Sequence, residues 1–138
     1  MSREPVFVAL GSNLGAREEH LAAARTALAT LPQTSLIAVS AIEETAPLGG
    51  ADQPAYLNQM VLLDTGLSPR ELLTACQTIE RAAGRERRER WASRTLDVDI
   101  VLFGTRTMSD PDLTIPHPGL AHRDFWRREL AELRTDDR

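Results

Sequence analysis

Two aspartates, Asp97 and Asp99, lie two positions apart in the apolar segment 94–102. A β-strand turns successive side chains to opposite faces, so both carboxylates would lie on one face, roughly 7 Å apart along the strand. Two like charges at that separation are unfavourable unless a cation lies over them, and hard divalent cations prefer oxygen ligands. The pair therefore predicts a metal site, with a solvated strand face as the alternative. The opposite face would carry the apolar residues Leu96, Val98, Ile100 and Leu102.

Arginines precede the aspartates at high density. Segment 81–94 holds six arginines and two glutamates, a local charge of +4 in a chain whose net charge is −4 and which has no lysine. Guanidinium groups bind phosphate oxygens through paired hydrogen bonds, whereas exposed Arg–Glu pairs contribute little to stability. Carboxylates that hold Mg²⁺, beside arginines that hold phosphate, are the two halves of a phosphoryl-transfer site. A solvated loop with internal Arg–Glu pairs is the alternative for the arginine run.

Tyr56 and Asn58 share one face of the predicted strand 56–65. A tyrosine ring offers a stacking surface, and an asparagine amide both donates and accepts hydrogen bonds. Together they suit a flat, amide-like heterocycle, although a half-buried tyrosine with a polar neighbour also occurs as a purely structural feature.

Two more side chains are candidates for contact with such ligands. His117 lies between Pro116 and Pro118, which favour an extended backbone, and its imidazole could donate a hydrogen bond to phosphate or simply cap a loop. Trp91 lies within the arginine run, either as a packing anchor or as a cover over a nucleotide.

The composition predicts one soluble globular domain, because the 138 residues are 42% hydrophobic and 26% charged. The single cysteine, Cys76, excludes an intrachain disulfide framework and suits the cytosol. No apolar stretch is long enough to cross a bilayer and no signal-peptide pattern opens the chain, so we expect a cytoplasmic protein without membrane contacts. One short basic run on an acidic remainder argues against a nucleic-acid partner.

The hydrophobic pattern predicts the order strand, helix, strand, strand, helix, strand, followed by a last helix. This order is typical of the ferredoxin-like α+β fold, a mostly antiparallel sheet with helices packed on it. A capping box at Ser68–Glu71 predicts the start of the second helix, and Gly84 its end. Segment 11–15 predicts a turn and helix cap, with a phosphate loop as the alternative, and 46–54 is a Pro- and Gly-rich loop. The expected strands are 6–10, 35–45, 56–65 and 97–103, and the expected helices run through 21–31, 69–84 and 123–133.

In this order and spacing, the motifs resemble the 6-hydroxymethyl-7,8-dihydropterin pyrophosphokinase family of folate biosynthesis. The resemblance covers roughly residues 6–125 and is most specific at Arg94–Ile100, with the sequence R-T-L-D-V-D-I. The helix 126–133 departs from the family because it carries more charge than is usual. The other matching segments are 8–13, 45–49, 52–58, 77–80, 84–85, 90–91, 102–104, 115–117 and 123–125.

The resemblance implies transfer of the β,γ-pyrophosphoryl group of ATP to the hydroxymethyl oxygen of a reduced pterin, with release of AMP. It implies two Mg²⁺ ions held by Asp97 and Asp99, and a lid formed by the arginine-rich segment. The implied catalytic residues are Arg85, Arg94, Asp97 and Asp99. The implied ATP-binding residues are Gln77, Glu80, Arg85, Trp91, Arg94, Ile100, His117 and Arg123. The implied pterin-binding residues are Thr45, Ala46, Leu48, Tyr56, Asn58 and Phe125.

Two alternatives stay open at this point. A paralogue would transfer pyrophosphate to another pterin, and a non-catalytic ferredoxin-like module would bind a nucleotide without turning it over. The aspartate pair favours an enzyme, because a pure binding module does not need two adjacent metal carboxylates. We expect a monomer whose partners are the small molecules ATP and a reduced pterin.

Overall fold

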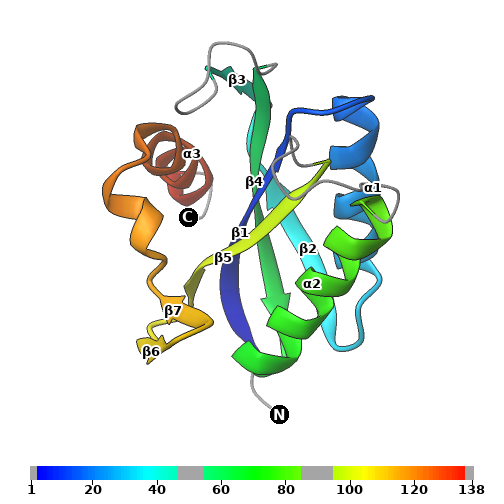
Figure 1. Cartoon of the computed structure of the whole chain (residues 1–138). Coiled ribbons are helices and arrows are strands. Elements are labelled where there is room, and N and C mark those ends of the chain that lie inside the picture. Colours follow the sequence, from blue (N-terminus) through cyan, green and yellow to red (C-terminus); the bar gives the residue numbers. More distant parts are fainter. Residues whose placement is uncertain (1–2, 47–54, 85–94, 136–138) are drawn as a thin grey trace.

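The computed structural model describes residues 3–46, 55–84 and 95–135 (Figure 1). Most of the predicted loop 46–54 and most of the arginine-rich segment lie outside these ranges. The strands are β1 (Glu4–Ser12), β2 (Thr34–Val39), β3 (Glu43–Thr45), β4 (Tyr56–Thr65), β5 (Asp97–Phe103), β6 (Met108–Asp110) and β7 (Leu113–Ile115). The helices are α1 (Arg17–Ala29), α2 (Pro69–Gly84), α3 (Asp124–Thr135) and the 3₁₀ turn η1 (Pro118–Ala121).

An antiparallel sheet forms the middle layer of the molecule. Its strands run in the order β2, β4, β1, β5, and β3 pairs with the start of β4 beyond the end of β2. Helices α1 and α2 cover one face of the sheet, and α3 lies against the other (Figure 1). The expected α+β fold with a mostly antiparallel, ferredoxin-like sheet is therefore confirmed.

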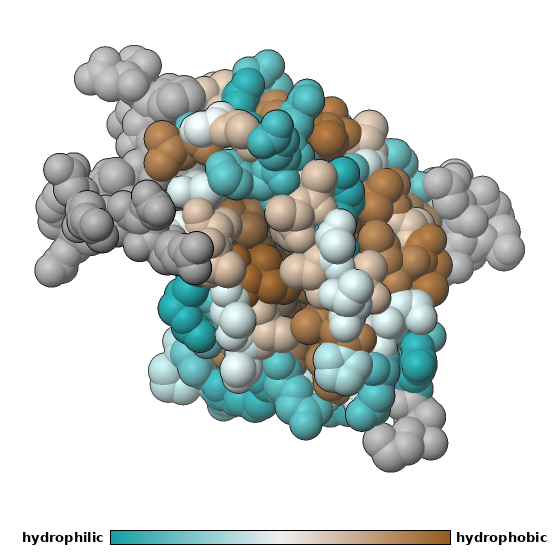
Figure 2. All heavy atoms as spheres, turned by 90° about the vertical axis from the view of Figure 1, so that its right-hand side faces the viewer, coloured by the Kyte–Doolittle hydropathy of each residue, from teal (hydrophilic) through white to brown (hydrophobic). Residues whose placement is uncertain are grey.

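The alternation of side chains along β1 divides the core between the two faces of the sheet. Val6, Val8 and Leu10 pack beneath α1 and α2, whereas Phe7 and Ala9 pack on the side of α3. The central strand therefore anchors both helix layers, as expected where neighbouring side chains alternate. Figure 2 shows the α1/α2 side, where hydrophilic side chains cover the lower part and hydrophobic ones show near the centre.

Helix α2 begins as the sequence predicts. The Glu71 N–H donates to Ser68 Oγ at 3.1 Å, and the Ser68 N–H donates to Glu71 Oε1 at 2.8 Å. This reciprocal pair satisfies two N–H groups that the helix itself leaves unbonded. Leu72 and Cys76 are buried against the sheet, so the helix lies alongside β5.

The prediction of one strand at 35–45 is wrong, because two strands occupy that segment. Ser40 lies between β2 and β3 and is buried. Its N–H donates to the Met60 carbonyl oxygen (2.8 Å), and its hydroxyl oxygen accepts from the Met60 N–H (2.9 Å). Its carbonyl oxygen accepts from the Gln59 side-chain amide (2.6 Å). A side chain that takes the place of a backbone partner interrupts the ladder of strand hydrogen bonds.

The prediction that Leu102 shares a face of the strand with Val98 and Ile100 is also wrong. The pairing of β5 with β1 skips Val101, which is the extra residue of a β-bulge. Because a bulge breaks the alternation of faces, Leu102 packs on the α3 side instead of beside Val98 and Ile100. The two aspartates precede the bulge and keep the common face that the sequence predicts.

The sequence pattern does not predict the β6–β7 hairpin or the turn η1. The predicted cap of the first helix is also wrong, because α1 has Ala16 at its N-cap and no side-chain hydrogen bond there. Gly15, with φ +72°, supplies the turn before it. Within the described residues, none of the helices combines the length and apolar character needed to cross a membrane.

Candidate functional site

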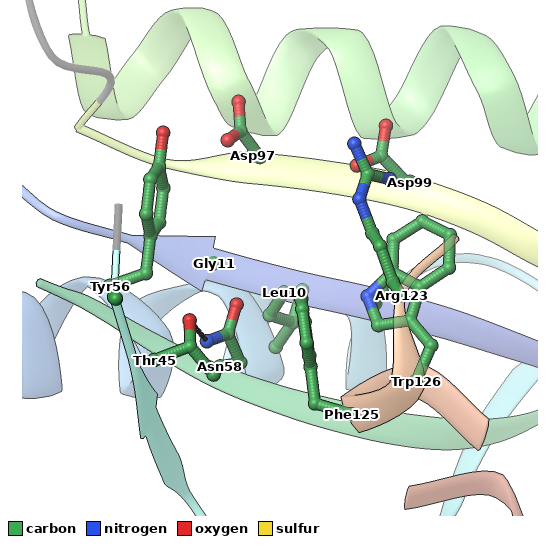
Figure 3. Close-up of a pocket in the computed structure, with 12 residues that line it drawn as sticks. Leu10, Gly11, Thr45, Tyr56, Asn58, Asp97, Asp99, Arg123, Phe125 and Trp126 are labelled. Atoms are coloured by element: carbon green, nitrogen blue, oxygen red, sulfur yellow. Dashed lines mark hydrogen bonds between the residues drawn. The ribbon is translucent and has the colours of Figure 1, made fainter. Parts of the chain in front are cut away.

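An open pocket lies on the α3 side of the sheet, with an empty volume of about 690 Å³ that partly opens to solvent. Its walls come from β1, β4, β5, the end of β3 and the start of α3 (Figure 3). The lining residues are Ala9, Leu10, Gly11, Thr45, Ala46, Tyr56, Asn58, Asp97, Asp99, Arg123, Phe125 and Trp126.

Asp97 and Asp99 line one wall of this pocket and point the same way from β5 (Figure 3). Their partners across the sheet are small, with Gly11 opposite Asp97 and Ala9 opposite Asp99, which leaves space beside the carboxylates. Proteins usually hold Mg²⁺ through one or two carboxylates together with substrate phosphates. The described residues contain no group of three metal-binding side chains. The carboxylates of Asp97 and Asp99 would leave coordination positions of the ion open for phosphate oxygens, so this pair fits Mg²⁺.

Glu80 links helix α2 to the strand that carries the aspartates. Its Oε2 accepts a hydrogen bond from the Val98 N–H at 2.7 Å. Behind the strand, burial first, and then the charges of Glu80 and Asp99, raise the pKa of the Cys76 thiol to about 12. The thiol is therefore neutral, and the carboxylates around it make this part of the site favourable for cations.

His117 faces Asp99 from the chain segment before η1. Its Nδ1 accepts from the Gly119 N–H at 2.8 Å, so the neutral imidazole carries its proton on Nε2. That Nε2 lies 3.9 Å from Asp99 Oδ1. Burial lowers the pKa of His117, the Asp99 charge raises it, and the Arg123 charge lowers it. The result is a lowered pKa and an imidazole oriented as an N–H donor beside the aspartates.

Tyr56, Asn58 and Thr45 lie at the other end of the pocket (Figure 3). The Asn58 amide donates to Thr45 Oγ1 at 2.7 Å and to the Glu43 carbonyl oxygen at 3.4 Å. With these N–H groups engaged, Asn58 presents its Oδ1 as an acceptor. A Cβ atom on Gly11 would lie 3.3 Å from that Oδ1, so glycine at this position keeps the space beside the acceptor open.

Three side chains near the start of α3 complete the pocket. The Arg123 guanidinium carbon lies 4.5 Å from the centre of the Trp126 ring. The Trp126 and His117 rings are 4.9 Å apart and nearly perpendicular, at 86°. The half-buried Phe125 lies on the other side of the pocket from Tyr56 and gives it a second aromatic wall (Figure 3).

The structure does not bring every predicted residue to this pocket. The Ile100 side chain is buried on the α1/α2 side of the sheet, and Gln77 is exposed on α2; neither lines the pocket. His117 adjoins it through Asp99, whereas Glu80 accepts from the backbone of Val98, whose side chain packs on the α1/α2 side and does not line the pocket. Four predicted residues lie outside the described part of the chain, so their roles stay predictions: Leu48, Arg85, Trp91 and Arg94.

Sequence reasoning misses four lining residues, Ala9, Leu10, Gly11 and Trp126. A glycine within a strand often marks a close approach of another group, and this was the available signal for Gly11. Trp126 follows Phe125 directly at the start of a helix, but a charged helix gives no sign of which residue turns inward.

A family model described as 7,8-dihydro-6-hydroxymethylpterin-pyrophosphokinase matches residues 7–135. The chain is similar to proteins named 2-amino-4-hydroxy-6-hydroxymethyldihydropteridine pyrophosphokinase. That of Pseudomonas aeruginosa is 47% identical over 131 residues, which are 95% of this chain and 81% of the relative. That of Haemophilus influenzae is 42% identical over 94% of this chain and 81% of its own length. That of Bacillus subtilis is 43% identical over 92% of this chain and 76% of its own length.

Proposed function

Because the chain belongs to the 7,8-dihydro-6-hydroxymethylpterin-pyrophosphokinase family, we propose that it transfers the β,γ-pyrophosphoryl group of ATP to the hydroxymethyl oxygen of 6-hydroxymethyl-7,8-dihydropterin. AMP is the second product. The observation that carries this proposal is one pocket lined both by two carboxylates, Asp97 and Asp99, and by the side chains of Tyr56, Asn58 and Phe125. A module that bound only a nucleotide would not need the aromatic and amide side chains of Tyr56, Phe125 and Asn58 beside the carboxylates.

The pterin ring would lie between the side chains of Tyr56 and Phe125, which supply two aromatic surfaces. Asn58 Oδ1 would accept hydrogen bonds from N–H groups on the ring edge. The bond from Asn58 to Thr45 Oγ1 fixes the amide before the substrate arrives, so little side-chain freedom is lost on binding. Ala46 and Leu48 would complete the contacts with the pterin.

Asp97 and Asp99 would hold two Mg²⁺ ions, which supply charge neutralisation for the phosphates and lower the pKa of the attacking hydroxyl. The pterin hydroxyl oxygen attacks the β-phosphorus of ATP, and the bond from this phosphorus to the α–β bridging oxygen breaks. The bonding electron pair leaves with AMP, and the hydroxyl proton passes to solvent. Since both reactants are bound, the main task of the protein is to position them and to stabilise charge.

The cationic groups of the chain would position the triphosphate. Arg123 and the Nε2–H of His117 would donate to phosphate oxygens near Asp99, and Arg85 and Arg94 would add further contacts. The remaining residues proposed for the nucleotide are Gln77, Glu80, Trp91 and Ile100.

The decisive assay follows nucleotide products by chromatography, with ATP, Mg²⁺ and the reduced hydroxymethyl pterin each supplied or withheld. We expect AMP and pterin diphosphate in equal amounts only when all three are present. Formation of ADP, or no AMP with any reduced pterin from a folded protein, would overturn the proposal. AMP formation with a different reduced pterin, but not with this one, would identify the paralogue.

The metal role is tested by Asp97→Ala and Asp99→Ala, with Asp64→Asn, a change at a half-buried position near the end of β4, as a control. Each of the first two substitutions should lower kcat roughly 10²–10³-fold, the usual effect of losing an electrostatic contact at the reacting centre. Circular dichroism should show an unchanged fold. Turnover near that of the wild type in either variant would refute the metal role.

We also propose that the enzyme acts as a cytoplasmic monomer. The ordinary charged composition and the free, buried Cys76 support this location. Light scattering coupled to size-exclusion chromatography tests the monomer, and a mass twice that of the chain would contradict it.

A further inference from the structure

Trp126 contacts two of the groups that face the aspartates. Its side chain is almost fully buried, at 4% exposure, and packs with Leu130 and Leu133 against the α3 side of the sheet. The same ring lines the pocket and contacts Arg123 and His117. Trp126 therefore contacts both the hydrophobic core and the two groups, Arg123 and His117, that face the aspartates.

Arg123 is held by packing and backbone contacts. Its N–H donates to the Gly119 carbonyl oxygen at 3.0 Å. A Cβ atom on Gly119 would lie only 2.4 Å from Arg123 Nη1, so the guanidinium rests directly against the glycine. Within the described part of the chain, no carboxylate forms an ion pair with Arg123. Among these residues, no carboxylate competes with a ligand for the Arg123 guanidinium.

We propose that Trp126 is a positioning residue of the reaction, which holds the Arg123 guanidinium against its ring so that the donors of Arg123 face the phosphates of ATP. The perpendicular contact with His117 fixes the plane of the indole. An arginine has many rotamers, and a guanidinium on an aromatic face is attracted by the ring quadrupole. The inference rests on the proposed function, and it gives a role to the helix 126–133 whose sequence departs from the family.

The first test compares Trp126→Phe with Trp126→Leu, alone and in the Arg123→Ala background. Phenylalanine keeps an aromatic face and should retain most of the activity. Leucine removes that face and should lower kcat/KM for ATP roughly 2- to 30-fold, the range expected for a cation–π contact. In the Arg123→Ala background the same leucine change should have almost no further effect, because interacting residues are not additive.

The second test uses a variant that leaves the core intact. Gly119→Ala places a methyl group where the guanidinium lies, at a turn with no buried residue. We expect lower kcat/KM for ATP, an unchanged KM for the pterin and an unchanged melting temperature. Ala121→Ser, an exposed change in the same turn, is the matched control and should behave like the wild type.

The outcomes separate this inference from the function on which it rests. Three results would overturn the positioning role while the enzyme remains active. The losses of activity in Trp126→Leu and Arg123→Ala could be additive, or Gly119→Ala could have wild-type kinetics. Trp126→Leu could also raise only the KM for the pterin. A wild-type protein that forms no pterin-dependent AMP would overturn the proposed function, and the positioning role with it.

Discussion

Replacing Glu129 with glutamine should stabilise the protein, and the gain should increase as the pH rises from 5 to 8. Glu129 lies in α3 and is only 3% exposed. Neither of its carboxylate oxygens receives a hydrogen bond from the described residues. Burial first, and then the negative charge of the nearby Glu43, raise the pKa of Glu129 to about 8. The nearby Arg128 opposes this shift, and Glu132 adds to it.

The sign of the effect follows from proton binding. Between the ordinary pKa of 4.5 and the folded value of about 8, the folded state binds a proton that the unfolded state has lost. Stability therefore falls as the pH rises through this window and is level on either side of it. With these two pKa values, the carboxyl group costs about 1 kcal/mol at pH 5 and about 3 kcal/mol at pH 7. Glutamine has a similar shape and no ionisation, so it removes this cost.

The measurement is urea unfolding of the wild type and Glu129→Gln at pH 5, 6, 7 and 8. The difference in the free energy of unfolding between the two proteins should grow with pH. Glu132→Gln is the control in the same helix, because Glu132 is exposed and its amide replacement can still accept from the Ala41 N–H. If the free energies of unfolding of the wild type and Glu129→Gln depended on pH in the same way, the reasoning would be refuted. Glu129 would then have the same pKa in the folded and unfolded states.

Three further predictions follow from local geometry. Cys76, buried with its pKa raised to about 12, should not react with a thiol reagent at pH 8 until the protein is unfolded; rapid labelling of the native protein would contradict its burial. Gly104→Ala should lower the free energy of unfolding by about 1–2 kcal/mol, because φ is +55° and the new Cβ would lie 2.6 Å from Glu4 Oε1. Gly84→Ala, where the new Cβ would lie 4.0 Å from Thr95 Oγ1, is the control in the same denaturation experiment and should not be destabilising. Asn58→Leu should raise the KM for the pterin roughly tenfold through loss of a hydrogen bond and leave the KM for ATP unchanged; equal rises in both would contradict the assignment of this end of the pocket to the pterin.

Much of the fold follows from short-range patterns that the sequence contains. The alternation of faces along 56–65 and the Ser68–Glu71 capping box are local, and both are confirmed in the structure: Met60 and Leu62 pack on the α3 side, and Val61 and Leu63 on the other. The common face of Asp97 and Asp99 also depends only on strand geometry between neighbours. These features need no knowledge of the rest of the molecule.

The features that sequence does not predict depend on distant partners. The bulge at Val101 arises from register with β1, and the break at Ser40 arises from hydrogen bonds to β4. Neither partner is visible in the local pattern. The burial of Glu129 and Trp126 depends on which face of α3 meets the sheet, and a helix rich in charge gives a weak signal of that choice.

The separation of α3 from the other helices has a consequence for how the protein is made. The two helix layers lie on opposite faces of the sheet, and only the α3 layer faces the pocket. During synthesis, β1 through β5 and both helices of the α1/α2 layer leave the ribosome before α3 does. An emerging chain can therefore complete one half of its core while the pocket still has no aromatic wall from Phe125 and no Arg123. The ability to bind both substrates would be acquired last, when the final described helix docks.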